Sequence, residues 1–283
     1  MRARGNFYRE EIRMMRYFEK ALLSGLGKMP VLSKYSSTRG WPFVMAWSNR
    51  IAGILLVLFL AFHILTLSSL STPGLYQEKM NTLRFFLFII LEWALAIPVI
   101  YHSLNGGRII LYECYGVRKE ESLIRWTLGL SILYAALLGI LMIMGKETVS
   151  SSFFWLTVLF GGGIIGYGVF SRIWETGHSL SWRLQRITGA FLIIMIPAHL
   201  TFMHLNPSMG HDAVTVLKRM QEPFIRAIDI IILIAAIYHG GFGLISIVKD
   251  YISSRPLSAC ITGIVVIGMA ILAIKGIWLT ISV

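Results

Sequence analysis

Seven long apolar segments set the strongest constraint on what this chain folds into. They cover residues 43–70, 84–107, 123–145, 153–172, 186–205, 225–247 and 258–281. A helix of about 20 mostly apolar residues crosses the hydrocarbon core of a bilayer. The 283 residues are 56% hydrophobic and 14% charged, with a mean hydropathy of +0.70, which lies outside the range of soluble domains. The sequence therefore predicts an all-α integral membrane protein with seven transmembrane helices.

The basic residues indicate how these helices are oriented. The net charge of +12 would suggest nucleic acid in a soluble protein, but the charges lie in short segments between apolar runs, so no nucleic-acid partner is expected. With the N-terminus in the cytoplasm, nineteen Lys and Arg lie on the inner side and six on the outer side. The positive-inside rule thus favours seven helices and a cytoplasmic N-terminus. The N-terminal arm lacks the apolar core of a signal peptide, so we expect it to remain attached.

A diverged internal repeat organises the chain. An arginine followed by Ile, any residue and Gly precedes a histidine by thirteen positions, from Arg50 to His63 and again from Arg186 to His199. Later in each half, a Tyr-His pair precedes a glycine and then an acid, eleven residues after the histidine. These second motifs contain Tyr101, His102, Gly106 and Glu113, and Tyr238, His239, Gly243 and Asp250. Agreement at this many positions indicates two related units.

The repeat divides the chain into four parts. These are a cytoplasmic N-terminal arm (1–40), a first three-helix repeat (41–146), a linker helix (147–180) and a second three-helix repeat (181–283). Both repeats begin at the inner face and run parallel, so the chain needs one extra crossing to return between them. The glycine-rich segment 153–172 supplies that crossing, and its glycines suit close helix packing.

Four histidines lie inside the apolar segments at two depths. His63 and His199 each follow an inner-face arginine by thirteen residues, about 20 Å at a rise of 1.5 Å per residue. His102 and His239 lie on returning helices, closer to the inner face. Ionisable groups in a membrane are costly and mark functional sites, and neutral imidazole ligates haem iron. The equal depths predict two bis-histidine haem b groups, one between His102 and His239 and one between His63 and His199.

Glycines accompany these histidines. Gly106 and Gly243 lie one helical turn from His102 and His239 on the same face, where the absence of a side chain leaves room for a flat macrocycle. Gly53 and Gly189 suit either a haem edge or helix packing.

Two acids lie farther out on the same helices. Glu92 and Asp229 each precede the inner histidine of their half by ten residues, which is about 15 Å. They suit proton transfer or contact with a quinone near the outer haem, and equally a place at a helix end that faces water.

At these residues the sequence resembles the cytochrome b membrane anchors of succinate dehydrogenase and fumarate reductase. The resemblance covers most of both repeats and excludes the arm and the linker helix. In two-subunit anchors, a His-x-x-x-Gly segment of each subunit supplies one axial ligand of a single haem, which corresponds to His102 and His239. In single-chain dihaem anchors, histidines late in the first helix of each half add a second haem, which corresponds to His63 and His199. The chain resembles a fusion of the two anchors that retains both haems.

The resemblance also implies a quinone pocket near the inner face. The two-subunit anchors use an arginine of the first helix and an Asp-Tyr pair, which match Arg50 and Asp250-Tyr251. The usual serine position holds Ala46, and Ser48 lies close by. Arginine and a phenol suit this task because both donate hydrogen bonds to a quinone carbonyl whose negative charge grows on reduction.

By this resemblance the chain is the dihaem anchor of a succinate:quinone oxidoreductase in the prokaryotic cytoplasmic membrane. Its partners would be an iron–sulfur subunit and a flavoprotein subunit, which carry the iron–sulfur clusters, the FAD and the dicarboxylate chemistry. The anchor, surrounded by membrane lipid, would bind quinone and relay electrons through its haems. Two haems favour menaquinone over ubiquinone by family analogy.

Two other functions are compatible with intramembrane histidines. One is the cytochrome b subunit of a formate dehydrogenase or hydrogenase, although neither the parallel repeat nor the Asp-Tyr pair matches that type. The other is a proton-coupled transporter whose repeats surround a site at the midplane, with the histidines relaying protons.

Overall fold

The computed structural model describes residue 24 and residues 40–83, 86–144, 151–205 and 208–282, and every regular element within them is a helix. The long helices of this part fall on the predicted spans: α3 (Trp41–Leu67), α5 (Phe86–Tyr115), α6 (Glu120–Met144), α7 (Ser151–Ile173), α8 (Leu180–Leu205), α11 (Pro223–Tyr251) and α12 (Arg255–Ser282). Short elements fill two connections: η1 (Ser68–Ser71) and α4 (Pro73–Leu83) after α3, and α9 (Ser208–His211) and α10 (Ala213–Gln221) after α8.

The helices have the lengths and surfaces of membrane spans. In the described residues, six stretches are long and apolar enough to cross a bilayer, namely α3 with η1, and α6, α7, α8, α11 and α12. Large apolar side chains cover their outer surfaces, including Phe62, Phe160, Ile264 and Ile274, as expected where lipid replaces water. The prediction of an all-α integral membrane protein is confirmed. The remaining predicted span, 84–107, coincides with α5, and its crossing of the membrane stays a prediction.

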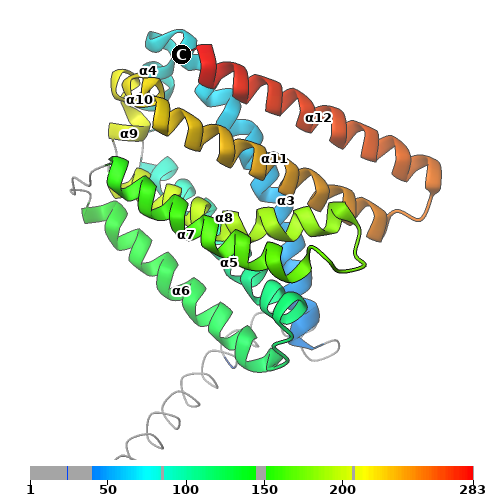
Figure 1. Ribbon diagram of the computed structural model, residues 1–283. Coiled ribbons are helices and arrows are strands. Elements are labelled where there is room, and N and C mark those ends of the chain that lie inside the picture. The colour runs from blue at the N-terminus through cyan, green and yellow to red at the C-terminus, as the bar shows by residue number, and fades with distance from the viewer. Residues whose placement is uncertain (1–23, 25–39, 84–85, 145–150, 206–207, 283) are drawn as a thin grey trace, which may run out of the picture.

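An inner bundle of four helices carries the histidines. α3 contacts α5 and α11, and α8 contacts the same two helices. Outside this bundle, α6 packs on α5, α12 on α11 and α7 on α8 (Figure 1). The contacts within and between the repeats correspond: α3, α5 and α6 of the first repeat take the same places as α8, α11 and α12 of the second. For example, α12 contacts α3 just as α6 contacts α8. The packing thus follows the sequence repeat, and α7 is the long helix that has no counterpart.

The third helix of each repeat packs through a glycine. A methyl group added at Gly139 of α6 would lie 2.9 Å from Nε1 of Trp93, and one added at Gly276 of α12 would lie 2.6 Å from Cδ2 of Leu233. Both contacts join the third helix to the second helix of its own repeat. Small residues let helices approach closely in a membrane, where lipid is as apolar as the side chains it replaces.

The end of α5 is set by its cap and not by hydropathy. The apolar pattern predicts an end at residue 107 because Arg108 follows, but the helix continues to Tyr115. Gly116 then adopts the left-handed conformation (φ 68°), and the N–H of Val117 donates to the carbonyl of Leu111 at 3.1 Å. The bond closes the helix end across Gly116, where glycine avoids the steric cost that a side chain would meet at a positive φ.

The short helices α4 and α10 form an outer cap, at the end of the bundle that the predicted topology places outside. The cap lies near the C-terminus (Figure 1). Their buried side chains pack with the end of α12 in one cluster, which contains Leu70, Tyr76, Met80, Ala213, Val216, Met220 and Leu279. The Tyr76 hydroxyl donates to the carbonyl of Gly210 at 2.6 Å. Asp212 caps α10 by accepting from the N–H of Thr215 at 2.8 Å. The cap was not predicted, because its helices are too short and polar to stand out by hydropathy.

The glycine packing generates a prediction about stability. We expect Gly276→Val to destabilise the protein by about 1–3 kcal/mol, the range typical of overpacked interiors, because the new side chain overlaps Leu233. Gly268→Val is the matched control, since a methyl group there, on the same helix, meets nothing within 4 Å. Thermal unfolding of the detergent-solubilised variants measures the difference. Equal losses from both variants would contradict the close packing of α12 on α11.

Candidate functional site

The structure brings the four intramembrane histidines together in two pairs, each joining one repeat to the other. The ring centroids of His102 (α5) and His239 (α11) lie 6.1 Å apart with an interplanar angle of 84°. Those of His63 (α3) and His199 (α8) lie 6.3 Å apart at 86°. Distance and angle agree closely between the pairs, so the two repeats present nearly the same geometry twice.

Each inner histidine is held by a backbone hydrogen bond. Nδ1 of His102 lies 3.2 Å from the carbonyl oxygen of Asn49, and Nδ1 of His239 lies 3.3 Å from that of Gln185. A carbonyl oxygen only accepts, so Nδ1 carries the proton and Nε2 keeps its lone pair. Metal-bound histidines commonly have this arrangement, in which the bond fixes both tautomer and ring orientation.

A glycine of the arginine motif packs against each inner imidazole. A methyl group at Gly53 would lie 3.3 Å from Cε1 of His102, and one at Gly189 would lie 2.9 Å from Cε1 of His239. The alternative of helix packing therefore accounts for both glycines. At Gly106 an added methyl group meets nothing within 4 Å, and at Gly243 it meets only Nε2 of Gln185, at 3.9 Å.

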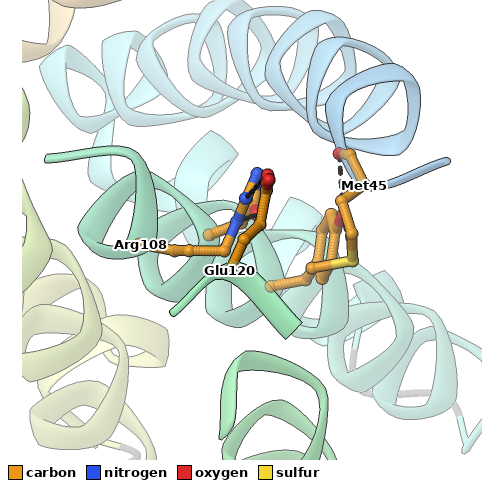
Figure 2. Close-up of polar contacts among 5 residues, drawn as sticks. Met45, Arg108 and Glu120 are labelled. Carbon is orange, nitrogen blue, oxygen red and sulfur yellow. Dashed lines mark hydrogen bonds and ion pairs between the residues drawn. The ribbon is translucent and has the colours of Figure 1, made fainter. Parts of the chain in front are cut away.

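The tyrosines before the inner histidines tie the helices of each repeat together. The Tyr101 hydroxyl donates to the carbonyl of Met45 at 2.9 Å, as Figure 2 shows at Met45. The Tyr238 hydroxyl donates to the carbonyl of Ser181 at 3.1 Å. Met45 and Ser181 both precede the arginine of their motif by five residues, so these bonds follow the repeat as well.

Two ion pairs join the repeats at the inner end of the bundle, the end that the predicted topology places inside. Nη2 of Arg50 lies 2.9 Å from Oδ2 of Asp250, and Nε of Arg186 lies 2.6 Å from Oε2 of Glu113. Each arginine thus pairs with the acid that follows the inner histidine of the other repeat. The side chains of Arg50 and Asp250 are 38% and 51% exposed, against 22% and 32% for Arg186 and Glu113.

The predicted quinone residues lie in two places. Arg50, Asp250 and Tyr251 come together: the guanidinium carbon of Arg50 is 5.7 Å from the ring centroid of Tyr251, which is 58% exposed at the end of α11. Ser48 instead lines an apolar groove between α3 and α5, next to Tyr101. Residues two positions apart face different sides of a helix, so Ser48 is separated from the Arg50 cluster.

Arg108 is a buried charge at the inner end, whereas the sequence predicts only a cation at the inner face. Arg108 is 7% exposed, and its Nε donates to Oδ1 of Asn105 at 2.8 Å. Its Nη1 donates to Oε1 of Glu120 at 3.1 Å, which joins α5 to α6 (Figure 2). The spacing of Asn105 and Arg108 by three residues on one helix is the signal that was available.

Three amide atoms near the inner pair are buried and, within the described residues, have no hydrogen-bond partner. They are Oδ1 of Asn49, Nδ2 of Asn105 and Oε1 of Gln185. Asn49 and Gln185 are the residues whose carbonyls bind the inner histidines, and Asn105 lies one turn after His102. Unsatisfied buried polar groups are costly, so their clustering indicates a site that is built for an additional group.

The outer pair has aromatic neighbours. The ring of Phe59 stacks on His63 at a centroid distance of 5.7 Å, and Trp155 of α7 lies 6.0 Å from His199. Neither aromatic neighbour was predicted from the sequence, because aromatic residues are common throughout the apolar segments. Of the two predicted acids, Asp229 is half-buried on α11 and Glu92 is exposed on α5.

Fold and site define a multi-pass helical membrane protein in which two related units face each other across paired histidines. A family model described as the succinate dehydrogenase/fumarate reductase transmembrane subunit matches residues 29–143 and 170–276. These ranges make up more than half of the chain, so the chain belongs to this family. The predicted resemblance to the membrane anchors of succinate dehydrogenase and fumarate reductase is therefore confirmed at the level of the family.

Two curated relatives agree with the family. A succinate dehydrogenase hydrophobic membrane anchor subunit of Archaeoglobus fulgidus is 25% identical over 107 residues, which are 37% of this chain and 89% of the relative. The succinate dehydrogenase 2 membrane subunit SdhC of Mycobacterium tuberculosis is 29% identical over 106 residues, 36% of this chain and 76% of the relative. No solved structure is significantly similar to the chain.

The two ion pairs differ in burial, and this difference is testable. Exposed pairs contribute about 0.2–1 kcal/mol, and solvent screening reduces the contribution as exposure rises. We expect double-mutant cycles on unfolding free energy to give a larger coupling for Arg186 with Glu113 than for Arg50 with Asp250, using Gln for each charge. The coupling energy of Arg186 with Glu113 should lie near the upper end of this range. A larger coupling for the more exposed pair would contradict the geometry.

Proposed function

We propose that the chain is the dihaem cytochrome b anchor of a succinate:quinone oxidoreductase and relays electrons between an iron–sulfur subunit and membrane quinone. The proposal rests on the two histidine pairs, which have nearly the same distance and angle between their rings. In each pair, one histidine comes from the first repeat and the other from the second. His102 and His239 are the proposed axial ligands of an inner haem b, and His63 and His199 those of an outer haem b. Bound haem supplies one-electron redox chemistry at each level.

The spacing of the rings fits this assignment. Metal–imidazole bonds are about 2.0–2.1 Å in well-studied protein sites, so two imidazoles on opposite sides of one metal have ring centres roughly 6–6.5 Å apart. The observed centroid distances of 6.1 and 6.3 Å fall in this range. The inner histidines also keep Nε2 available as a ligand, since Nδ1 is bound to a backbone carbonyl.

The quinone would bind at the inner end, at Arg50, Asp250 and Tyr251. Arg50 is oriented by its 2.9 Å ion pair with Asp250, and guanidinium and phenol both donate hydrogen bonds. Such donors stabilise the negative charge that develops on quinone oxygens during reduction. The exposure of all three side chains is consistent with a pocket that the iron–sulfur subunit completes. Ser48, Glu92 and Asp229 lie apart from this cluster: in the part of the chain that the structure describes, no hydrogen bond or ion pair joins them to it.

The comparisons support a fusion of two anchor subunits. The family model covers two separate ranges, and each contains one arginine motif and two of the histidines. The Archaeoglobus fulgidus anchor is covered over 89% of its length by only 37% of this chain. We therefore assign residues 41–146 and 181–283 to the two anchor-like units, and 147–180 to the helix that joins them.

The remaining assignments follow from the family. The partners would be an iron–sulfur subunit and a flavoprotein subunit with FAD, where the dicarboxylate reacts. The location would be the cytoplasmic membrane of a prokaryote, with the N-terminus inside. Menaquinone is the favoured quinone.

Substitution of the histidines tests the haem assignment. We expect His102→Ala and His63→Ala each to remove a different one of two haem signals, because the two histidines belong to different pairs. His178→Ala is the control, since His178 is exposed outside the helices. Reduced-minus-oxidised absorption spectra of the purified protein measure the signals. Wild-type protein without haem absorbance would overturn the proposed function, and loss of one and the same signal from both variants would overturn the pairing.

A second prediction concerns the quinone. Loss of a hydrogen bond to a charged group costs about 1.5–3 kcal/mol, so Arg50→Gln and Tyr251→Phe should lower kcat/KM for quinone roughly ten- to hundredfold. Succinate oxidation with a soluble electron acceptor should not change, because it bypasses the anchor. Lys119→Gln, an exposed cation at the same end, should retain wild-type kinetics. Wild-type quinone kinetics in both site variants would rule out this pocket.

A further inference from the structure

The outer cap holds a cation that the repeat does not require. Arg219 lies on α10, which is fixed in the cap by its neighbours Val216 and Met220, both buried. In the register that aligns His102 with His239, the corresponding residue of α4 is Thr82. The first repeat thus builds its half of the cap without a cation at this position, so packing alone does not explain Arg219.

The guanidinium of Arg219 is poorly satisfied. Its Nη1 lies 3.2 Å from Sδ of Met203, and a thioether is a weak acceptor. Within the described residues, its Nε is buried and has no hydrogen-bond partner. An arginine at a membrane surface usually extends its head group into water, but here a donor is kept out of water and unused. Such an arrangement fits an acceptor that is added from outside the chain.

The position of Arg219 indicates which acceptor. Met203 follows His199 by one helical turn on α8, so the guanidinium lies on the cap side of the outer pair. The positive charge of Arg219 also acts on Tyr76 in the cap: burial raises the pKa of Tyr76, and this charge opposes that rise.

We propose that Arg219 binds a propionate carboxylate of the haem held by His63 and His199. This inference rests on the proposed function, because it requires the outer haem. Planar guanidinium groups bind carboxylates through two parallel hydrogen bonds, and a haem carries two carboxylates at its edge. Arg219 is then a positioning residue: it orients the haem, and its positive charge favours the reduced state, which carries one positive charge less.

Redox titration of the haems in the purified protein tests the proposal. We expect Arg219→Gln to lower the reduction potential of one haem, by about a tenfold change in the reduction equilibrium, which is 59 mV for a one-electron couple. The affected haem should be the one that His63→Ala removes. Arg219→Lys should restore most of the potential, because it keeps the charge. Lys218→Gln makes the same change of charge on an exposed neighbour and should leave both potentials unchanged.

The outcomes separate this inference from the proposed function. Absence of a second haem from the wild-type protein would overturn the proposed function and the inference together. Two haems with unchanged potentials in Arg219→Gln, or equal shifts in Arg219→Gln and Lys218→Gln, would overturn the inference alone. Loss of the outer haem from Arg219→Gln but not from Lys218→Gln, with the inner haem retained as proof of folding, would support it.

Discussion

The bond from an imidazole Nδ1 to a backbone carbonyl is the interaction on which the inner site depends. It satisfies a polar group that would otherwise be costly inside a membrane, and it fixes which nitrogen remains free. The accepting carbonyls belong to Asn49 and Gln185, the residues just before the two motif arginines. A single short motif therefore places a histidine acceptor, an ion-pairing arginine and, three residues later, a glycine against the imidazole ring. This combination explains why arginine and glycine keep the same spacing in both repeats.

The repeat produces two similar inner ends that differ in what covers them. Near Glu113, α7 packs alongside: the Arg172 guanidinium lies 5.5 Å from the ring of Tyr115, and a methyl group at Gly168 would lie 3.2 Å from the Tyr115 hydroxyl. At the other end, the ion pair of Arg50 with Asp250 is more exposed than that of Arg186 with Glu113. The Asp-Tyr pair also occurs only there, since Cys114 follows Glu113. The same repeated arrangement is thus more exposed at Asp250 and is covered by α7 near Glu113.

Hydropathy and internal repetition predicted the fold because membrane helices must be long, apolar and continuous. The same reasoning predicted that His63 lies near His199 and His102 near His239, because the rise of a helix converts sequence spacing into depth in the membrane. It failed where other forces decide: the end of α5 is set by the positive φ of Gly116, and the outer cap is held by burial in helices too short for a hydropathy signal. Arg108 and Arg219 were counted only as cations, because sequence shows charge but not which side chains become buried beside it.

The contacts between the repeats have a consequence for how the protein is made. Arg50 and Asp250 are 200 positions apart, which corresponds to roughly 10–40 s of synthesis at about 5–20 residues per second. The first repeat is complete at residue 146, which leaves roughly 5–20 s until Asp250 is made. When this period begins, the arginine and both intramembrane histidines of the first repeat do not yet have their partners, which are still to be synthesised. Two separate subunits would have to find each other by diffusion in this state. Fusion into one chain makes the encounter intramolecular and limits the lifetime of the half-assembled bundle to the time of translation.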